Sequence, residues 1–521
     1  MNSARDSHFV ERCLCLVSCA GLTLAGCAVG PTYERPEVQL NANWSEQQDS
    51  RIATQTAPDA QWWSTFSDPV LNNLVDLAYK QNLSLQVTGL RILEARARLG
   101  YAHGQRYPQV QAAVGGATIN EPSELALNTI QTGTFYDYQI GFDASWEIDF
   151  WGKYKKGVTA EESGYLSTVA DYDNALVSLA SEVARTYTSL RTFEVLIKLA
   201  QENVTVQEEG LRIAQARFDN GATSELDVTQ ARTLLESTRA TIPQLEASRQ
   251  QAENALSTLL GQTTGSIRQI LAGPVAIPMP PAQVSISVPA EMLRRRADIR
   301  AAELNAMAQS DRVGIAQTDF YPRVALFGSV GTQVGDGDNV SSSFSDLLSS
   351  GSWFYTFGPR MLWTVFNYGR IKNNVRVEDA RFQESLVSYQ NTVLRAGQEV
   401  DDALAGFLRS QEAAVFARNA ADSAQQSVDL AFVQYREGAV DFQRVLDAQR
   451  SLLEEENTLA DIDSSVATNL IALYKALGGG WEMQQNQPYI NDAIREQMQK
   501  RTNWGEYFSE TPSDVVSDTK R

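Results

Sequence analysis

The sequence contains no cysteine after residue 27 and almost no histidine. All four cysteines lie near the N-terminus of the 521-residue chain: Cys13, Cys15, Cys19 and Cys27. The rest of the chain therefore cannot form a disulfide, bind a metal through thiolates or use a cysteine nucleophile. The two histidines are His8 and His103, and only His103 lies outside the N-terminal segment, so it alone could serve a serine–histidine triad. We expect no enzyme, no catalytic residues and no metal site.

Long hydrophobic runs and an excess of positive charge are also missing. Outside the N-terminal segment no stretch of 18 apolar residues occurs, whereas a membrane-spanning helix needs about 20. Lys and Arg together number 44 against 63 Asp and Glu, which gives a formal net charge of -19. This acidic balance argues against nucleic acid as a partner, because binding phosphate groups requires Lys and Arg. Any part of the chain that spans a membrane must therefore do so as β-strands.

The N-terminus resembles a bacterial lipoprotein signal. A short apolar run over residues 13–24 leads into the sequence Leu-Ala-Gly-Cys, which ends at Cys27. This run is too short to span a bilayer as a helix. The resemblance implies that residues 1–26 are removed and that Cys27 carries a covalent lipid, the only attached group we expect. Ala28 is not aspartate and so resembles the class that is sorted to the outer membrane. A plain secretory signal is the alternative.

Residues 136–150 alternate between two kinds of side chain. The even positions are apolar: Tyr136, Tyr138, Ile140, Phe142, Ala144, Trp146, Ile148 and Phe150. The odd positions between them, from Asp137 to Asp149, are polar or small. A period of two predicts a β-strand whose two faces meet different environments. A soluble sheet would offer core and water, whereas a membrane barrel would offer lipid and a wet lumen.

An internal duplication organises the chain after residue 60. Tyr107-Pro108 recurs as Tyr321-Pro322, and Gly221-Ala222 recurs as Gly438-Ala439. Recurrence of such pairs at a nearly constant offset predicts two structural repeats. The expected segments are a signal peptide (1–26), a lipid-anchored polar lead-in (27–60), the first repeat (61–261), a Pro-rich connector (262–289), the second repeat (290–480) and a polar C-terminal tail (481–521).

Each repeat is expected to contain a helix, two strands and a long helical hairpin. The first has a helix over 71–106, strands over 110–119 and 136–150, a long helix over 152–221 and a return helix that ends near 261. The second has a helix over 293–319, strands over 323–334 and 353–366, a long helix over 369–438 and a return helix that ends near 478. A long helix would measure roughly 100 Å. Apolar residues at heptad spacing from Val445 to Leu473 predict coiled-coil packing of the last return helix, which a soluble stalk would also show.

Four strands per chain cannot close a barrel. In hydrocarbon an open sheet edge leaves backbone groups unpaired, at a cost of several kcal/mol each. If the strands face lipid, several copies of the chain must pool them, because single-chain bacterial barrels begin at about eight strands. Aromatic residues cluster at the expected strand ends, as in the aromatic girdles of membrane barrels: Tyr136, Tyr138, Trp146, Phe150, Trp151, Trp353, Tyr355 and Trp363. This clustering favours the barrel over a soluble sandwich.

At this point several stretches together resemble the outer-membrane efflux proteins, the TolC-like channels, and in particular their NodT-type lipoprotein branch. The stretches are LAGCAVGPTYERP, WWSTFSDPVLNNLV, LRRRADIRAAE, YREGAVDFQRVLDAQRSL and ALGGGW. The resemblance implies a mixed α and β membrane protein that forms a homotrimer, with a 12-stranded β-barrel built from four strands per chain. It also implies a long periplasmic α-helical barrel. The family's role is the passive exit duct of a tripartite efflux system for small molecules such as drugs. Its partners would be a periplasmic adaptor and an inner-membrane transporter, with the resistance-nodulation-division class favoured.

The candidate site residues lie where the long helices reverse. Gly221 and Gly438 permit the turns, and the resemblance implies that these tips are the periplasmic entrance, where the adaptor docks. Asp441 could form a ring of carboxylates in a trimer or cap a helix.

Other charges near the tips could act with Asp441. Arg217, Asp219 and Arg436 could hold the entrance shut by pairing across neighbouring tips, or could be ordinary surface charges. The basic run Arg294–Arg296, followed by Asp298, is interpreted as a solvated helix start with local ion pairs.

Three other functions stay open. The chain could serve a different export system, such as type I-like secretion. It could be a structural lipoprotein with a coiled-coil stalk. An outer-membrane lipase would have to depend on His103.

Overall fold

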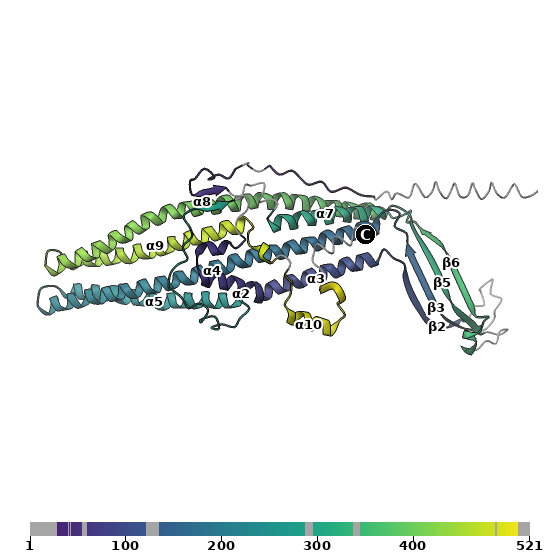
Figure 1. Cartoon of the computed structure of the whole chain (residues 1–521), viewed down its shortest axis with the longest axis horizontal. Helices are drawn as coiled ribbons and strands as arrows, with labels where there is room; N and C mark the ends of the chain where they lie inside the picture. Colours follow the sequence, from purple (N-terminus) through teal and green to yellow (C-terminus); the bar gives the residue numbers. More distant parts are fainter. Residues whose placement is uncertain are drawn as a thin grey trace, which may run out of the picture. The chain divides into compact units, whose positions relative to one another are not determined.

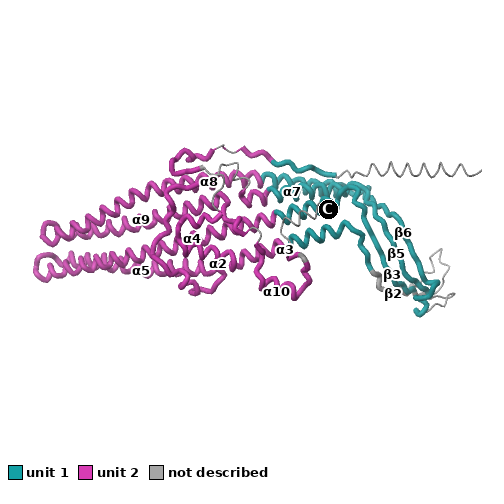
Figure 2. The backbone as a smooth tube through the Cα atoms, viewed as in Figure 1, with its two compact units in different colours: residues 1–35, 94–166, 303–387 teal, residues 36–93, 167–302, 388–521 magenta. Residues whose placement is uncertain are grey.

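The computed structural model describes residues 29–39, 41, 43–54, 60–120, 135–286, 295–336, 344–484 and 487–508. The expected signal peptide and Cys27 lie outside these residues. The chain forms two compact units, which Figure 2 colours separately: unit 1 contains residues 1–35, 94–166 and 303–387, and unit 2 contains residues 36–93, 167–302 and 388–521. Within the described part of the chain, no helix combines the length and the apolar character needed to cross a membrane.

Helices make up most of the chain (Figure 1). The α-helices are α2 (Pro69–Gln81), α3 (Leu83–Gly104), α4 (Lys153–Asp219), α5 (Glu225–Leu259), α7 (Ala297–Thr318), α8 (Arg370–Arg436), α9 (Phe442–Ala476) and α10 (Asp492–Arg501). The single-turn helices are η1 (Trp62–Phe66), η2 (Phe344–Leu348), η3 (Trp481–Gln484) and η4 (Gly505–Phe508). Helices α4 and α8 have 67 residues each, and α5 and α9 have 35 each.

Unit 1 contains a four-stranded antiparallel sheet. Its strands are β2 (Gln109–Asn120), β3 (Phe135–Glu147), β5 (Arg323–Asp336) and β6 (Trp353–Leu362), in the order β2-β3-β5-β6. Phe142 lies opposite Val330, and the next residue, Asp143, lies opposite Ser329. The register therefore gathers apolar side chains on one face and polar or small ones on the other. The strands expected to reach residues 150 and 366 end earlier, at Glu147 and Leu362.

Two tryptophans of unit 1 form hydrogen bonds to the backbone at the points where a helix ends and a strand begins. The indole Nε1 of Trp146 donates to the carbonyl oxygen of Arg106 over 2.9 Å, and Trp363 donates to that of Phe320 over 3.0 Å. Each carbonyl immediately precedes a Tyr-Pro pair. Trp146 and Trp363 therefore donate to backbone carbonyls at the positions where a proline interrupts the hydrogen bonding of the preceding helix.

The helix expected over residues 71–106 is broken into α2 and α3. Asn82 lies between them with extended backbone angles, and its Oδ1 accepts from the amide of Leu85 over 2.7 Å. Its Nδ2 donates to the carbonyl of Leu259 over 2.8 Å. The side chain thus bonds both to the new helix start and to the end of α5, which offsets the loss of helical hydrogen bonds at the break.

Unit 2 contains the core around α9. Val445, Leu452, Val466 and Leu473 of the expected heptad series are buried. A second group packs around η1, where the Trp62 ring stacks on Tyr474 with the centroids 5.4 Å apart. The heptad spacing therefore predicted the buried side of α9 correctly.

Three short elements of unit 2 were not expected. Strand β1 (Ile52–Thr54) pairs in parallel with β4 (Val284–Ile286), so the lead-in is joined to the Pro-rich connector. Met498 of α10 (Asp492–Arg501) and Ile490, which precedes the helix, pack against Leu93. Part of the C-terminal tail is therefore folded.

Candidate functional site

The two hairpin tips of unit 2 reverse at glycines. Gly221 has a φ of 70° and Gly438 a φ of 76°, a left-handed conformation that side chains disfavour. The amide of Ala222 donates to the carbonyl of Arg217, and that of Ala439 donates to the carbonyl of Gln434. These bonds, with those of the glycine amides, define the Schellman helix ending. The predicted tip turns are confirmed at both positions.

The tips of the two hairpins share one hydrophobic cluster. Its buried members come from all four helices: Ala214, Val228, Ala231, Leu234, Tyr435, Phe442, Val445 and Leu446. The rings of Tyr435 and Phe442 lie 5.1 Å apart. Because both tips contribute to the same core, the two hairpins of one chain are coupled at this end (Figure 1).

Arg217 joins the end of α4 to the end of α8. Its Nη1 donates to the carbonyl oxygen of Tyr435, and its guanidinium lies over the Tyr435 ring, 4.5 Å from the centroid. This carbonyl belongs to the last turn of α8, where a cation also interacts favourably with the helix dipole. Burial raises the pKa of the Tyr435 phenol, and the nearby Arg217 charge acts in the opposite direction. The phenol therefore stays neutral, with its ring available to the cation.

The other predicted gate residues also have partners within the chain. Asp441 is the N-cap of α9 and accepts from the amide of Arg444 over 3.4 Å, while its carboxylate is exposed. Asp219 accepts from Gln215 over 2.8 Å. Arg436 lies 3.6 Å from a carboxylate oxygen of Glu209. The pairing of these charges across neighbouring copies stays a prediction.

A buried arginine lies elsewhere in unit 2. Arg296 is only 7% exposed, so the interpretation of this basic run as solvated is wrong at this position. Its Nη1 donates to the carbonyl of Ala476 over 2.9 Å, and its Nη2 to Asp298 and Glu399 over 2.7 Å each. Burial lowers the pKa of Arg296, but the two carboxylates outweigh that effect and raise it overall.

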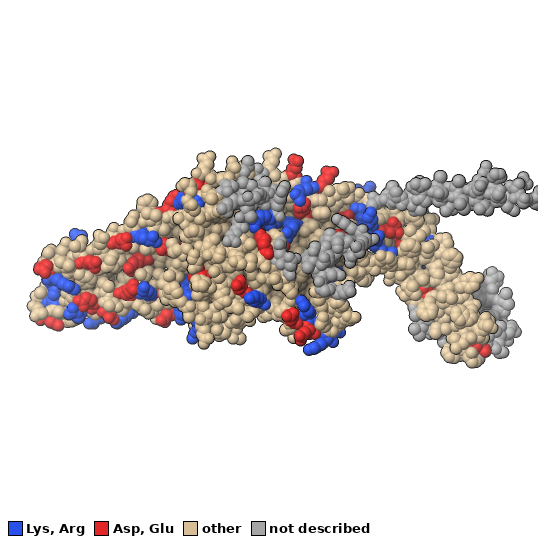
Figure 3. All heavy atoms as spheres, viewed as in Figure 1, with Lys and Arg blue, Asp and Glu red and all other residues tan. Residues whose placement is uncertain are grey.

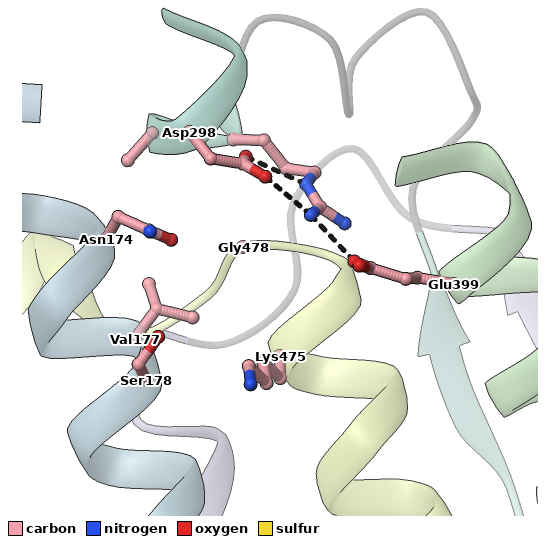
Figure 4. A pocket seen from close by; sticks show the side chains of 9 residues that line it. Asn174, Val177, Ser178, Asp298, Glu399, Lys475 and Gly478 are labelled. Atoms are coloured by element: carbon pink, nitrogen blue, oxygen red, sulfur yellow. Dashed lines mark hydrogen bonds and ion pairs between the residues drawn. The ribbon is translucent and has the colours of Figure 1, made fainter. Parts of the chain in front are cut away.

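This arginine lines a polar pocket of about 200 Å³. Asp298 comes from α7, Glu399 from α8 and Lys475 from α9, and the dashed lines of Figure 4 mark the ion pairs made by the two carboxylates. Positive and negative groups are balanced around the pocket, and its arginine is fully paired. The arrangement therefore joins the start of α7 and the end of α9 to α8 through the ion pairs and the hydrogen bond of Arg296.

Across the described residues, no group of three or more His, Asp or Glu side chains is arranged to hold a metal ion. Figure 3 shows charges of both signs scattered over the long helices, whereas the visible part of the strands is nearly free of them. The sequence did not indicate that Arg296 is buried, and it did not indicate the aromatic partner of Arg217. The aromatic partner of Arg217 is Tyr435, the first residue of the stretch YREGAVDFQRVLDAQRSL, and an aromatic residue beside the tip could have suggested this contact.

Comparisons with known proteins place this architecture in a family. The family model described as outer membrane efflux protein matches residues 74–262 and 288–479. Outer membrane protein OprJ of Pseudomonas aeruginosa is 32% identical over 475 residues, covering 88% of this chain and 94% of its own. Cation efflux system protein CusC of Escherichia coli K12 is 30% identical over 473 residues, covering 90% and 99%. A solved structure of the outer-membrane channel OprN matches with a TM-score of 0.80 and 30% identity, covering 88% of this chain and all of that one.

The chain belongs to the outer membrane efflux protein family. It is an outer-membrane protein that shares its fold with outer-membrane channels, and its described residues are mostly helical with one larger sheet.

Proposed function

We propose that this protein is the exit duct of a tripartite efflux system, formed by three copies of the chain. Small molecules would pass from an inner-membrane transporter of the resistance-nodulation-division class, through a periplasmic adaptor, to the exterior. The transporter would supply the energy and most of the substrate selectivity. A lipid on Cys27 would anchor each copy.

The open sheet of unit 1 carries this proposal. Strands β2 and β6 are its two edges, and the apolar face of β6 is bare, with Tyr355 86% exposed. An apolar face in contact with hydrocarbon requires every backbone group to be paired, because each unpaired group costs several kcal/mol. Pairing β6 of one copy with β2 of the next, three times over, closes a 12-stranded barrel without an edge.

The long helices would continue the duct as a periplasmic α-barrel. The equal lengths of α4 and α8, and of α5 and α9, support two structural repeats over residues 61–261 and 290–480. A helix of 67 residues spans about 100 Å at a rise of about 1.5 Å per residue. That length suits a conduit through the periplasm.

The hairpin tips would form the periplasmic entrance and the docking surface for the adaptor. Three copies would bring three exposed Asp441 carboxylates around one axis, and such a ring favours cations. The turns at Gly221 and Gly438 would present the tips to the adaptor, and Arg217, Asp219 and Arg436 would help to hold the entrance shut.

Ion selectivity in planar lipid bilayers tests this proposal. The purified oligomer should conduct and should prefer cations. Asp441→Asn should lower the cation preference while leaving the fold intact, since asparagine caps a helix about as well as aspartate. Asp447→Asn is the matched control, because Asp447 is also an exposed acid on α9. An oligomer that never conducts would contradict the duct, and equal effects of both variants would contradict the entrance ring.

A further inference from the structure

The turn η2 (Phe344–Leu348) covers the end of the sheet in unit 1 where β5 passes into β6. Leu347 is buried, and the ring of Phe344 meets that of Tyr138 edge-on, with the centroids 5.7 Å apart. Beneath this turn, Thr332 and Val334 of β5 are also buried. Leu347, Thr332 and Val334 are therefore covered, although the sheet is otherwise bare on this side.

The register shows which face η2 occupies. Tyr138 lies opposite Val334, and Ile140 lies opposite Thr332. Thr332 in turn lies opposite Trp353 at the start of β6. All five belong to the apolar face, so η2 lies on the outer side of the wall that the sheets would form.

The turn η2 adds exposed apolar side chains to the apolar face of the sheet. Phe344 is 67% exposed and Leu348 is 84% exposed. Ser345, Asp346 and Ser349, which are also exposed, give the turn a polar side. The hydroxyl of Ser352 donates to the carbonyl of Leu347 over 2.7 Å and fixes the return into β6. An exposed apolar group rimmed by polar side chains is typical of a surface that contacts a membrane or another molecule.

We propose that Phe344 and Leu348 form an interfacial wedge, held on the sheet by the buried Leu347, that inserts at the boundary between the headgroups and the acyl chains of the outer leaflet. This inference rests on the proposed function, because it requires the apolar face of the sheet to meet lipid. The wedge is continuous with that face through Tyr138, whose ring meets that of Phe344. Its polar side chains place it at the boundary with water, where amphipathic segments reside. Strand β5 follows α7 directly, so η2 lies at the strand ends farthest from the helices along the chain, which are the exterior ends.

Site-directed fluorescence tests the wedge. Leu348→Cys is labelled with an environment-sensitive bimane in phosphatidylcholine proteoliposomes of the full-length oligomer. Because Leu348 is exposed, the substitution leaves the packing of η2 intact. All native cysteines lie at or before residue 27, so the unsubstituted protein gives the labelling blank. Two references are labelled alike: Phe357→Cys on the apolar face of β6 and Thr356→Cys on its polar face.

The label at residue 348 should emit at shorter wavelength than the label at residue 356. Lipid nitroxides near the headgroups should quench it more strongly than nitroxides deep in the acyl chains. Quenching at residue 348 by iodide alone would overturn the wedge, and so would resistance to both iodide and lipid nitroxides, which would mean burial against a second copy. If residue 357 also escaped lipid nitroxides, the membrane barrel itself would fail; if residue 357 were quenched and residue 348 were not, only the wedge would fail.

Discussion

Removing the guanidinium of Arg296 should destabilise the C-terminal end of α9, so that its last turn opens more often. Arg296→Met keeps most of the side-chain volume and deletes every hydrogen bond that the guanidinium makes. The carbonyl of Ala476 then loses its donor, and the carboxylates of Asp298 and Glu399 lose their shared cation. The perturbation is local, because Ala476, Asp298 and Glu399 are all direct partners of the Arg296 guanidinium in unit 2.

The structure sets the size of the effect. Breaking a fully buried ion pair costs about 3–5 kcal/mol. Here Glu399 is 55% exposed and can be hydrated by water, so losing its ion pair with Arg296 contributes less to the free-energy cost. The buried arginine and the Ala476 carbonyl keep the cost appreciable, at about 2–3 kcal/mol. At about 1.4 kcal/mol per factor of ten, local opening should become roughly 30- to 150-fold more frequent.

Hydrogen exchange followed by mass spectrometry measures this opening directly. Peptides from the last turns of α9 and the first turn of α7 should exchange faster in Arg296→Met. Arg98→Met is the matched control, because the pair between Arg98 and Glu94 is exposed on both sides and contributes only a few tenths of a kcal/mol. Unchanged exchange in α9, or equal effects of the two variants, would refute the assignment of Arg296 as a buried tie.

Three further predictions concern other parts of the chain. Gly89→Ala should release the C-terminal segment to limited proteolysis, because a Cβ there would lie 2.1 Å from the carbonyl oxygen of Tyr489; Gly104→Ala on the same helix has no neighbour within 4 Å and should change nothing. Arg217→Met should remove about 1–2 kcal/mol of coupling between the hairpin tips, seen as more frequent channel openings in planar bilayers, and unchanged opening would count against its role at the entrance. Cys27→Ala should remove the acyl mass from the mature protein and reduce its retention in the outer membrane, whereas an unaltered mass would refute lipidation.

Features that depend on local periodicity could be predicted from the sequence. The alternation along residues 136–150 predicted a two-faced strand, because successive side chains of a strand point to opposite faces. The glycines at 221 and 438 predicted the tip turns, because few other residues adopt a left-handed conformation. The heptad spacing of apolar residues in α9 predicted its buried side, because residues seven apart lie on the same side of a helix.

Features that depend on distant partners could not be predicted. Arg296 sits in a run of charges that is typical of a solvated surface, and its burial follows from the end of α9, 180 residues away. The break at Asn82 is stabilised by a carbonyl of α5, and nothing near residue 82 indicates that partner. Strand β1 has only three residues, and its pairing with β4 joins two segments that both read as polar or extended connections.

The number of chains in the membrane-extracted particle tests the central claim most directly. Native mass spectrometry of the protein released from detergent or nanodiscs should give three copies, because only pooled sheets pair the edges of β2 and β6. A folded single copy that stays soluble without detergent would contradict the account.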